Sequence, residues 1–249
     1  MSHSTIARMA VSEPLRAPFG YDEIVALDKT HRVLMPSGTT PSFCRSINAL
    51  AVSVGEFIAA ARDYPIVFAT GDAGKSFAPV ILLGLEAGVN LFLDESGEWD
   101  REAYFPAYVR RFPFCLSKER IVCIVRSYVD AAGLPLYDAR GNPTSRWQAA
   151  ERLLAGFEDD LERTAQMCGA LAKLELLESF SVQVKDAPQM QLVGMVRVAE
   201  PKLRALAPAR VKALLDKGFM GLIYAHLHSL ENFSRLVARW NLRKAAGRG

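Results

Sequence analysis

The chain has 249 residues, of which 50% are hydrophobic and 23% charged, and its formal net charge is +3. This composition is typical of a globular protein with a sizeable core, and so small an excess of basic residues argues against nucleic acid as a partner. No stretch approaches the roughly 20 apolar residues that cross a bilayer, and residues 1–20 lack the continuous apolar core of a secretory signal, so we expect a cytoplasmic protein without a transmembrane segment.

The N-terminal region predicts a lead-in followed by one short helix. Residues 1–26 mix polar and apolar side chains around prolines and a glycine, which is typical of a flexible lead-in. A short helix is expected over Val54–Arg62, and Pro65 disfavours its continuation through the preceding residue.

Short apolar runs in the first half predict antiparallel strands. The runs are Ile66–Thr70, Phe77–Leu85, Asn90–Leu93 and Ile121–Val125. The first two flank a segment rich in turn-forming residues, so they are expected to pair as a hairpin. The last is a continuous apolar run, which is consistent with a buried strand.

A long helix is predicted to begin at Ser145, where Ser145 and Gln148 have the spacing of a capping box. Apolar residues then recur every seven positions: Trp147, Leu154, Leu161 and Cys168. Such a stripe usually faces the core of its own chain. A homodimer through the helix at 145–177 is the alternative interpretation.

The last third of the chain predicts a hairpin and two helices. Leu177–Val184 and Gln191–Val198 are the expected strand pair, and Pro208–Lys217 forms a short helix that Gly218 ends. Apolar residues from Phe219 to Trp240 alternate spacings of four and three, which predicts one final helix with a buried face. The expected fold class is therefore α+β: antiparallel strands and hairpins in the first half, a long helix, a further hairpin and C-terminal helices.

The segment Gly71–Ser76, with the sequence GDAGKS, ends like a phosphate-binding loop. The complete motif needs a glycine where Ala69 stands, and a helix after the lysine whose amide groups and dipole face the phosphates. Pro79 and β-branched residues follow instead, and they favour a strand. A hairpin turn is therefore expected here, and no bound nucleotide.

Metal binding and nucleophilic catalysis lack their usual patterns. His226 and His228 are two residues apart, whereas a chelating pair on a helix needs a spacing of three or four. His226 falls on the apolar stripe and is expected to be a hydrogen-bonded core residue. The cysteines show no metal-type pairing and are expected to be buried thiols: Cys44, Cys115, Cys123 and Cys168. We expect no metal, no cofactor and no catalytic residue, since a nucleophile elbow is also missing.

Aromatic and arginine residues are concentrated between positions 99 and 114. The candidate partner-binding residues are Trp99, Tyr104, Tyr108, Arg110 and Arg111. Arginine offers a planar fork for carboxylates, and aromatic residues are frequent at interaction hot spots. The alternative is that Trp99 and Phe114 fill the core while the arginine pair binds backbone carbonyls or local acids such as Asp100.

Several short segments occur in an order and spacing that resembles the SapC family of bacterial proteins. They are Tyr64–Phe68, Asn90–Leu93, Trp99–Asp100, Tyr104–Pro106 and Arg110–Phe114. The resemblance implies a single SapC-like domain, taken as residues 27–242, before a basic tail at 243–249. It also implies a link to bacterial surface-layer gene clusters and a poorly defined activity. The peptide-transporter permease of the same name is a different, integral membrane protein.

These observations lead to two main hypotheses of function. The first is a soluble, non-enzymatic accessory protein that binds an unknown peptide or protein partner in a bacterial surface-layer or outer-membrane uptake or export system. The alternative is an enzyme or enzyme subunit acting on peptides or small aromatic substrates, because the resemblance implies halogenase-like and cupin-like gene neighbours. A structural role in the surface layer itself is a weaker third hypothesis. A deep pocket with convergent polar groups would favour catalysis, and a broad groove would favour partner binding.

Overall fold

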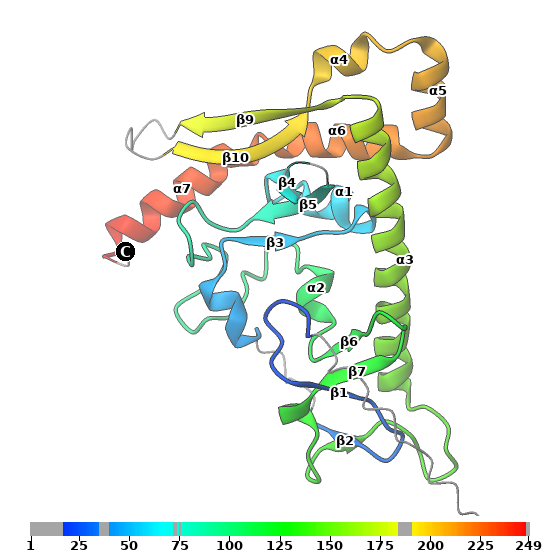
Figure 1. The fold of residues 1–249 in the computed structure, drawn as a ribbon. Helices are drawn as coiled ribbons and strands as arrows, with labels where there is room; N and C mark the ends of the chain where they lie inside the picture. Colours follow the sequence, from blue (N-terminus) through cyan, green and yellow to red (C-terminus); the bar gives the residue numbers. More distant parts are fainter. Residues whose placement is uncertain (1–16, 35–39, 72–73, 75, 184–190, 248–249) are drawn as a thin grey trace, which may run out of the picture. The chain divides into compact units, whose positions relative to one another are not determined.

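The computed structural model describes residues 17–34, 40–71, 74, 76–183 and 191–247. The chain divides into two compact units, whose helices and strands are labelled in Figure 1. The first unit is Met1–Met35 with Pro113–Thr144, and the second is Pro36–Phe112 with Ser145–Gly249. The expectation of one domain over 27–242 stays a prediction, because two compact units can still unfold as one cooperative structure.

In its described residues, the first unit is built on short antiparallel strands. A three-stranded sheet has the order β1-β7-β6, with β1 (Ile24–Ala26), β7 (Val122–Val125) and β6 (Phe114–Leu116). β2 (Arg32–Val33) pairs separately with β8 (Leu134–Pro135), and the short 3₁₀ helix η4 is Arg126–Tyr128. The strand predicted over Ile121–Val125 is confirmed as β7. β1 falls within the predicted lead-in, so the end of that segment belongs to a sheet.

A five-stranded antiparallel sheet forms the centre of the second unit, in the order β3-β5-β4-β10-β9. Its strands are β3 (Ala49–Ala51), β4 (Ile66–Gly71), β5 (Ser76–Leu82), β9 (Leu177–Gln183) and β10 (Gln191–Val198). Both predicted hairpins are confirmed, because β4 pairs with β5 and β9 with β10. The register of the second hairpin shifts between Leu192 and Met195, where Gly194 has a φ of 76°. Glycine adopts this conformation without strain, so it accommodates the bulge.

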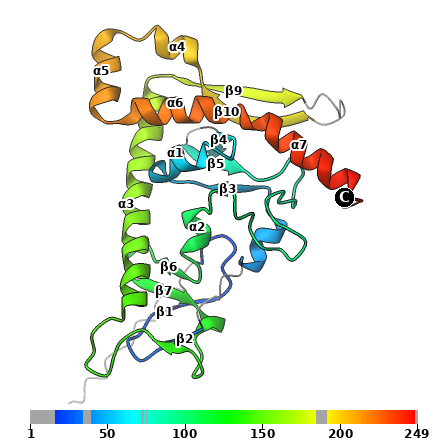
Figure 2. The ribbon, with the colours of Figure 1, turned by 180° about the vertical axis from the view of Figure 1, so that it is seen from behind.

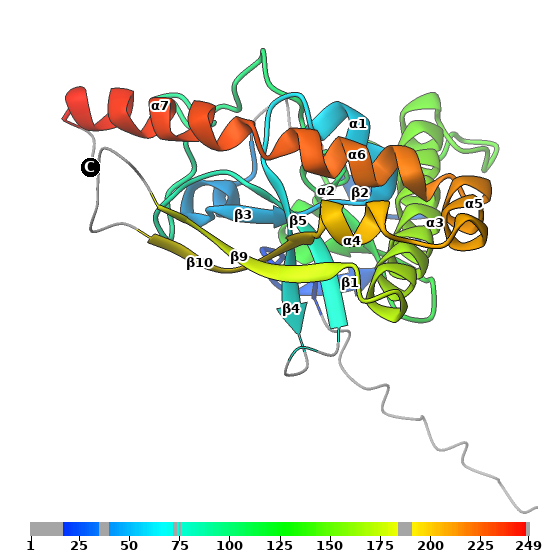
Figure 3. The same cartoon turned by 90° about the horizontal axis from the view of Figure 1, so that it is seen from above.

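Helices frame this sheet. They are η1 (Ser42–Ser46), η2 (Val54–Glu56), α1 (Phe57–Ala60), α2 (Ala107–Arg110), α3 (Ser145–Lys173), α4 (Glu200–Arg204), α5 (Pro208–Asp216), α6 (Phe219–Ser229) and α7 (Asn232–Ala245). α6 packs against β4, β10 and α1, and α7 continues beyond it in nearly the same direction (Figure 3). Within the part of the chain that the structure describes, no helix combines the length and the apolar character needed to cross a membrane.

The long helix α3 confirms the prediction of a core-facing helix that begins at Ser145. It stands as one continuous rod in the view from behind (Figure 2) and packs against β5 and η2. Trp147, Leu154 and Cys168 of its apolar stripe are buried, whereas Leu161 is 37% exposed. A homodimer through 145–177 remains a prediction, and it would have to use the face of α3 away from this stripe.

The strand predicted over Asn90–Leu93 is wrong. This segment is a turn, and its only ladder contact in the described residues is an isolated bridge between Leu93 and Trp99. The Asn90 amide explains the difference, because its Nδ2 donates to the Cys44 carbonyl at 3.0 Å and its Oδ1 accepts from the Phe92 amide at 2.9 Å. Local side-chain bonding of this kind replaces the regular ladder of a strand.

The single helix predicted from Phe219 to Trp240 is also wrong, since a turn at residues 230–231 separates α6 from α7. Polar side chains hold this break in place. Ser229 Oγ accepts from the Ile66 amide at 2.9 Å, and the Asn232 amide donates to the Ala61 carbonyl at 2.7 Å. The helix predicted over Val54–Arg62 is likewise shorter, because its first turn is the 3₁₀ helix η2 and α1 ends at Ala60.

Candidate functional site

The five residues predicted from the sequence do not share one surface. Trp99, Tyr108 and Arg111 are buried, with exposed fractions of 7%, 8% and 6%. Tyr104 is half-buried and Arg110 is exposed. Consecutive residues in a helical turn point about 100° apart, so the two arginines at the end of α2 diverge. Of the five, Tyr104 and Arg110 are the two whose side chains reach the surface of the described residues.

Trp99 belongs to the interior, as the core-filling interpretation expects. Its indole Nε1–H donates to the Tyr64 hydroxyl at 3.0 Å, and that hydroxyl donates to the Tyr104 carbonyl. The Phe105 ring meets the indole edge-on, with centroids 5.5 Å apart. Burial raises the pKa of the Tyr64 phenol, so the hydroxyl stays neutral and remains a donor.

Arg111 is held between two aromatic rings. Its guanidinium lies 4.5 Å from the centroid of Tyr108 and 4.4 Å from that of Phe157, with the nearest Glu158 oxygen at 3.9 Å. The alternative interpretation, in which the arginine pair binds backbone carbonyls or local acids such as Asp100, named a different acid from the one beside Arg111, which is Glu158. Asp100 Oδ2 accepts instead from Arg239 of α7, at 2.6 Å.

We expect the two arginines to differ sharply when truncated. Arg111→Ala removes a buried side chain that packs on two rings, and the free energy of unfolding should fall by about 2–3 kcal/mol. Arg110→Ala removes an exposed side chain and should cost less than about 1 kcal/mol. Urea unfolding of both variants checks this, and equal losses would contradict the burial assigned to Arg111.

Tyr104 and Arg110 line a small pocket of about 200 Å³ with the buried carboxylate of Glu56. The Arg110 Nη2 donates to the Tyr104 hydroxyl at 3.0 Å, and that hydroxyl donates to Glu56 Oε1 at 3.1 Å. The Ala107 amide donates to the same carboxylate oxygen at 2.6 Å. Burial, followed by the charge of Glu56, raises the pKa of Tyr104 to about 12. Because Ala107 begins α2 and Glu56 ends η2, the hydrogen bond between them connects the two helices.

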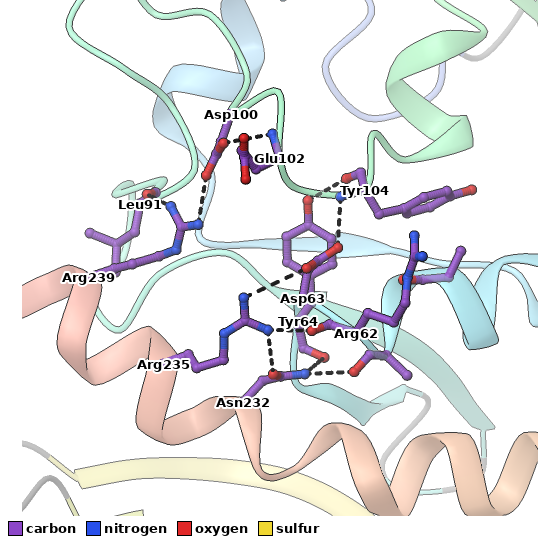
Figure 4. Close-up of polar contacts among 12 residues, drawn as sticks. Arg62, Asp63, Tyr64, Leu91, Asp100, Glu102, Tyr104, Asn232, Arg235 and Arg239 are labelled. Atoms are coloured by element: carbon purple, nitrogen blue, oxygen red, sulfur yellow. Dashed lines mark hydrogen bonds and ion pairs between the residues drawn. The ribbon is translucent and has the colours of Figure 1, made fainter.

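Three arginines on α7 were missed as site residues by the sequence interpretation, which assigned only a basic tail at 243–249. Arg235, Arg239 and Arg243 recur every four residues, so they lie along one face of the helix. Arg235 donates to the Arg62 carbonyl, and its Nη2 lies 3.9 Å from Asp63 Oδ1 (Figure 4). Arg239 forms an ion pair with Asp100 in the same region. The spacing of four within RLVARWNLR is the signal that was available in the sequence.

These contacts anchor α7 to the loops beside it. Arg239 lies over the Phe92 ring, 4.3 Å from its centroid, in addition to its ion pair with Asp100. Arg243 Nη1 donates to the Asn90 carbonyl at 3.0 Å. Asp63 Oδ2 accepts from the Tyr104 amide at 2.9 Å, which brings the predicted candidate Tyr104 into the same polar network (Figure 4).

An open pocket of the second unit lies at this end of α7. It has a volume of about 640 Å³, and arginines from two elements line it, namely Arg45 of η1 with Arg239 and Arg243 of α7. We call it the arginine-lined pocket. Leu242, with an exposed fraction of 72%, adds an apolar side chain at its wall. This volume falls within the range of small-ligand and peptide side-chain sites.

Arg45 is held flat against the chain. Its Nη2 donates to the Ser96 carbonyl, and Gly97 has a φ of 85° directly beneath it. A Cβ at position 97 would lie 1.9 Å from Arg45 Cζ, so a larger residue there would displace the guanidinium, and the positive φ itself favours glycine. The guanidinium is thus oriented by the fold itself before any ligand arrives.

Carboxylates complete the lining of the arginine-lined pocket. Asp94 and Glu95 both contribute to its wall. Asp94 Oδ1 accepts from the Ser96 hydroxyl at 2.6 Å and from the Glu98 amide at 3.0 Å, and these bonds lower the pKa of Asp94. Asp94 therefore stabilises its own turn. The pocket has charges of both signs beside an apolar wall, and no pair in it is arranged as a nucleophile and its base.

The remaining chemical predictions concern metals, nucleotides and thiols. His226 is fully buried, as expected of a core histidine. Its Nδ1 lies 2.8 Å from the Ile66 carbonyl oxygen, and its Nε2 accepts a hydrogen bond from the Val198 amide at 3.1 Å. Among the described residues no group of His, Cys, Asp and Glu is placed to hold a metal ion. Strand β5, rather than a helix, begins at Ser76, and the predicted turn falls largely on residues 72, 73 and 75, outside the described residues. All four cysteines are buried thiols, as predicted.

The fold and the site therefore define an α+β protein with a pocket lined by three arginines, two carboxylates and an exposed leucine. The sequence matches the family described as SapC over residues 28–236. This covers most of the chain, which therefore belongs to the SapC family. No curated protein and no solved structure matches it.

Proposed function

We propose that this protein is an accessory protein that binds a polypeptide segment of a partner in the arginine-lined pocket. One observation carries the proposal: Arg45, Arg239 and Arg243 line one open pocket, and a hydrogen bond from each guanidinium group already holds it to the fold. Groups oriented in advance lose little side-chain freedom on binding, so they favour recognition. The absence of a nucleophile–base pair in the described lining gives no support to catalysis.

The mixed lining favours a polypeptide over a simple inorganic anion. A carboxylate of the partner would bind the guanidinium groups of Arg45 and Arg243, since a planar fork matches a carboxylate. Leu242 offers contact to an apolar side chain of the same segment, and Glu95 offers an acceptor for its donor groups. Backbone and side-chain groups of a peptide present all three kinds of contact within a short length.

We place this binding function in the bacterial cytoplasm, in support of a surface-layer or outer-membrane uptake or export system. Membership of the SapC family supports this placement, because the resemblance implies a link to bacterial surface-layer gene clusters. The original candidates Tyr104 and Arg110 retain a place in the proposal, because both line the smaller pocket at the surface and can extend the contact with a partner.

Site-specific photo-crosslinking tests the proposal inside the cell. A benzophenone amino acid in place of Leu242 puts a reactive group at the wall of the pocket, and the exposed Ile58 of α1 is the matched control position. We expect a discrete polypeptide adduct from position 242 that position 58 does not give. Arg45→Ala in the same chain should reduce its yield by about tenfold, which corresponds to about 1.4 kcal/mol of binding free energy.

The result that contradicts the proposal is equally specific. If positions 242 and 58 give the same adducts, or if the adduct at 242 persists unchanged with Arg45→Ala, the arginine-lined pocket is not the binding site. A small molecule attached at position 242, with no polypeptide, would move the function toward the enzyme hypothesis.

A further inference from the structure

A second binding surface lies on α3 and α5, which run beside each other at one end of the second unit (Figures 1 and 3). The two helices enclose an open groove of about 410 Å³. Its floor is made of small and apolar residues, namely Gly169, Ala170 and Leu174 of α3 with Ala213 and Leu214 of α5. We call it the α3–α5 groove.

The charged residues that line the α3–α5 groove are all basic. Lys173, Arg210 and Lys217 line it, and none of the described residues lining it is a carboxylate. In the part of the chain that the structure describes, no ion pair joins these three cations to an acid, whereas Arg204 pairs with Glu200 and Lys212 with Asp216 close by. The groove is therefore an apolar floor with an uncompensated basic rim, and it complements an acidic, amphipathic partner.

The shape of the floor favours a helix as the occupant. Along each helix the lining residues recur at spacings of three and four, which is the pattern of a helix face that receives another helix. A Cβ at Gly169 would meet no atom within 4 Å, so the packing of this chain does not require glycine there. Glycine within a helix costs about 1 kcal/mol relative to alanine, and here it leaves room for a backbone to approach closely.

We propose that the α3–α5 groove binds an amphipathic helix of a protein partner, with a small apolar face set in the floor and acidic residues against Lys173, Arg210 and Lys217. A second copy of this chain is a poorer occupant, because the same groove would set like charges against one another. The groove uses none of the residues that line the arginine-lined pocket, so either proposal can fail alone.

The test is a selection from a display library of helical peptides about five turns long, with randomised apolar and flanking positions. We expect enrichment of helices with a small apolar face flanked by Asp and Glu. Gly169→Leu should weaken their binding by at least about tenfold, because the new side chain fills the groove. Ala155→Leu, at an exposed position of α3 outside the groove, should change affinity by less than about twofold.

A charge reversal makes the test sharper. The double variant Lys173→Glu with Lys217→Glu should lose the acidic helices and bind the same peptides with Lys in place of Glu. The proposal is overturned if no helix is enriched, or if enriched helices bind Gly169→Leu as tightly as the unmodified chain. It is also overturned if anionic vesicles, but not peptides, bind in a Gly169-dependent way, or if sedimentation shows a dimer that Gly169→Leu dissociates.

Discussion

Acidification is expected to destabilise this protein through His226 before most of its carboxylates are protonated. Burial lowers the pKa of His226 from 6.5 to about 4, since its ring is enclosed and the Arg197 charge adds to the effect. The Val198 amide already donates to Nε2, so protonation of Nε2 would place its N–H directly against the Val198 N–H. The unfolded chain therefore binds the proton more tightly than the folded one.

The sign of the pH effect follows from this difference. Where the unfolded state binds more protons, the free energy of unfolding falls as the pH falls. The loss from His226 begins as the pH drops below 6.5 and is complete near 4, and it amounts to about 3 kcal/mol. Urea unfolding at a series of pH values measures it.

His226→Gln is the matched variant for this prediction. It should be less stable than the unmodified chain at neutral pH, because an amide cannot reproduce both ring contacts. The difference in unfolding free energy between the two proteins should narrow steadily as the pH falls from 6.5 toward 4. Parallel curves over that window would show that His226 does not titrate as its burial requires.

Removing the Glu56 carboxylate is expected to give the largest loss among single substitutions at the candidate sites. Glu56 accepts from the amide and the hydroxyl of Ser53 at 3.2 and 3.1 Å, and from the Ala107 amide and the Tyr104 hydroxyl. Glu56→Ala removes the acceptor of these donors, and each donor that stays buried without a partner lowers the free energy of unfolding by about 1–3 kcal/mol. We expect the free energy of unfolding to fall by about 3 kcal/mol or more.

Glu56→Gln separates hydrogen bonding from packing. The amide oxygen can replace Oε1 and keep the contacts with Ala107 and Tyr104, while the amide nitrogen faces the Ser53 amide unfavourably. The loss should therefore be roughly half that of Glu56→Ala. Equal losses for the two variants, or a loss below about 1 kcal/mol for Glu56→Ala, would refute the structural role of this carboxylate.

Local patterns in the sequence predicted the elements that local chemistry determines. The β4–β5 hairpin follows from β-branched residues on both sides of a turn-rich segment, and α3 follows from apolar residues spaced by seven. Asn90–Leu93 was predicted wrongly because the Asn90 side chain bonds to the Cys44 carbonyl, distant in sequence. A capping-box spacing from Ser53 to Glu56 was present and would have singled out Glu56.

The candidate site was less predictable, because it depends on contacts between distant segments. Nothing local distinguishes Arg110, which is exposed, from Arg111, which is buried, since the packing of α2 alone decides which of two neighbours faces inward. The ion pair between Arg239 and Asp100 joins residues 139 positions apart. The arginine-lined pocket combines η1 with α7, and no spacing in the sequence indicates that these two elements meet.

Quantitative affinity purification from the organism that encodes this protein tests its proposed role most directly. Three forms are compared: the unmodified chain, the double variant Arg45→Ala with Arg243→Ala, and the control Arg204→Ala with Lys212→Ala, which removes the same charge from exposed ion pairs. Unfolding curves first establish that all three are folded. We predict one stoichiometric polypeptide partner with the unmodified chain and the control, depleted by about tenfold or more with the pocket variant. Recovery of the protein alone, or of the same partner in equal amounts with all three forms, would contradict an accessory protein that binds its partner through the arginine-lined pocket.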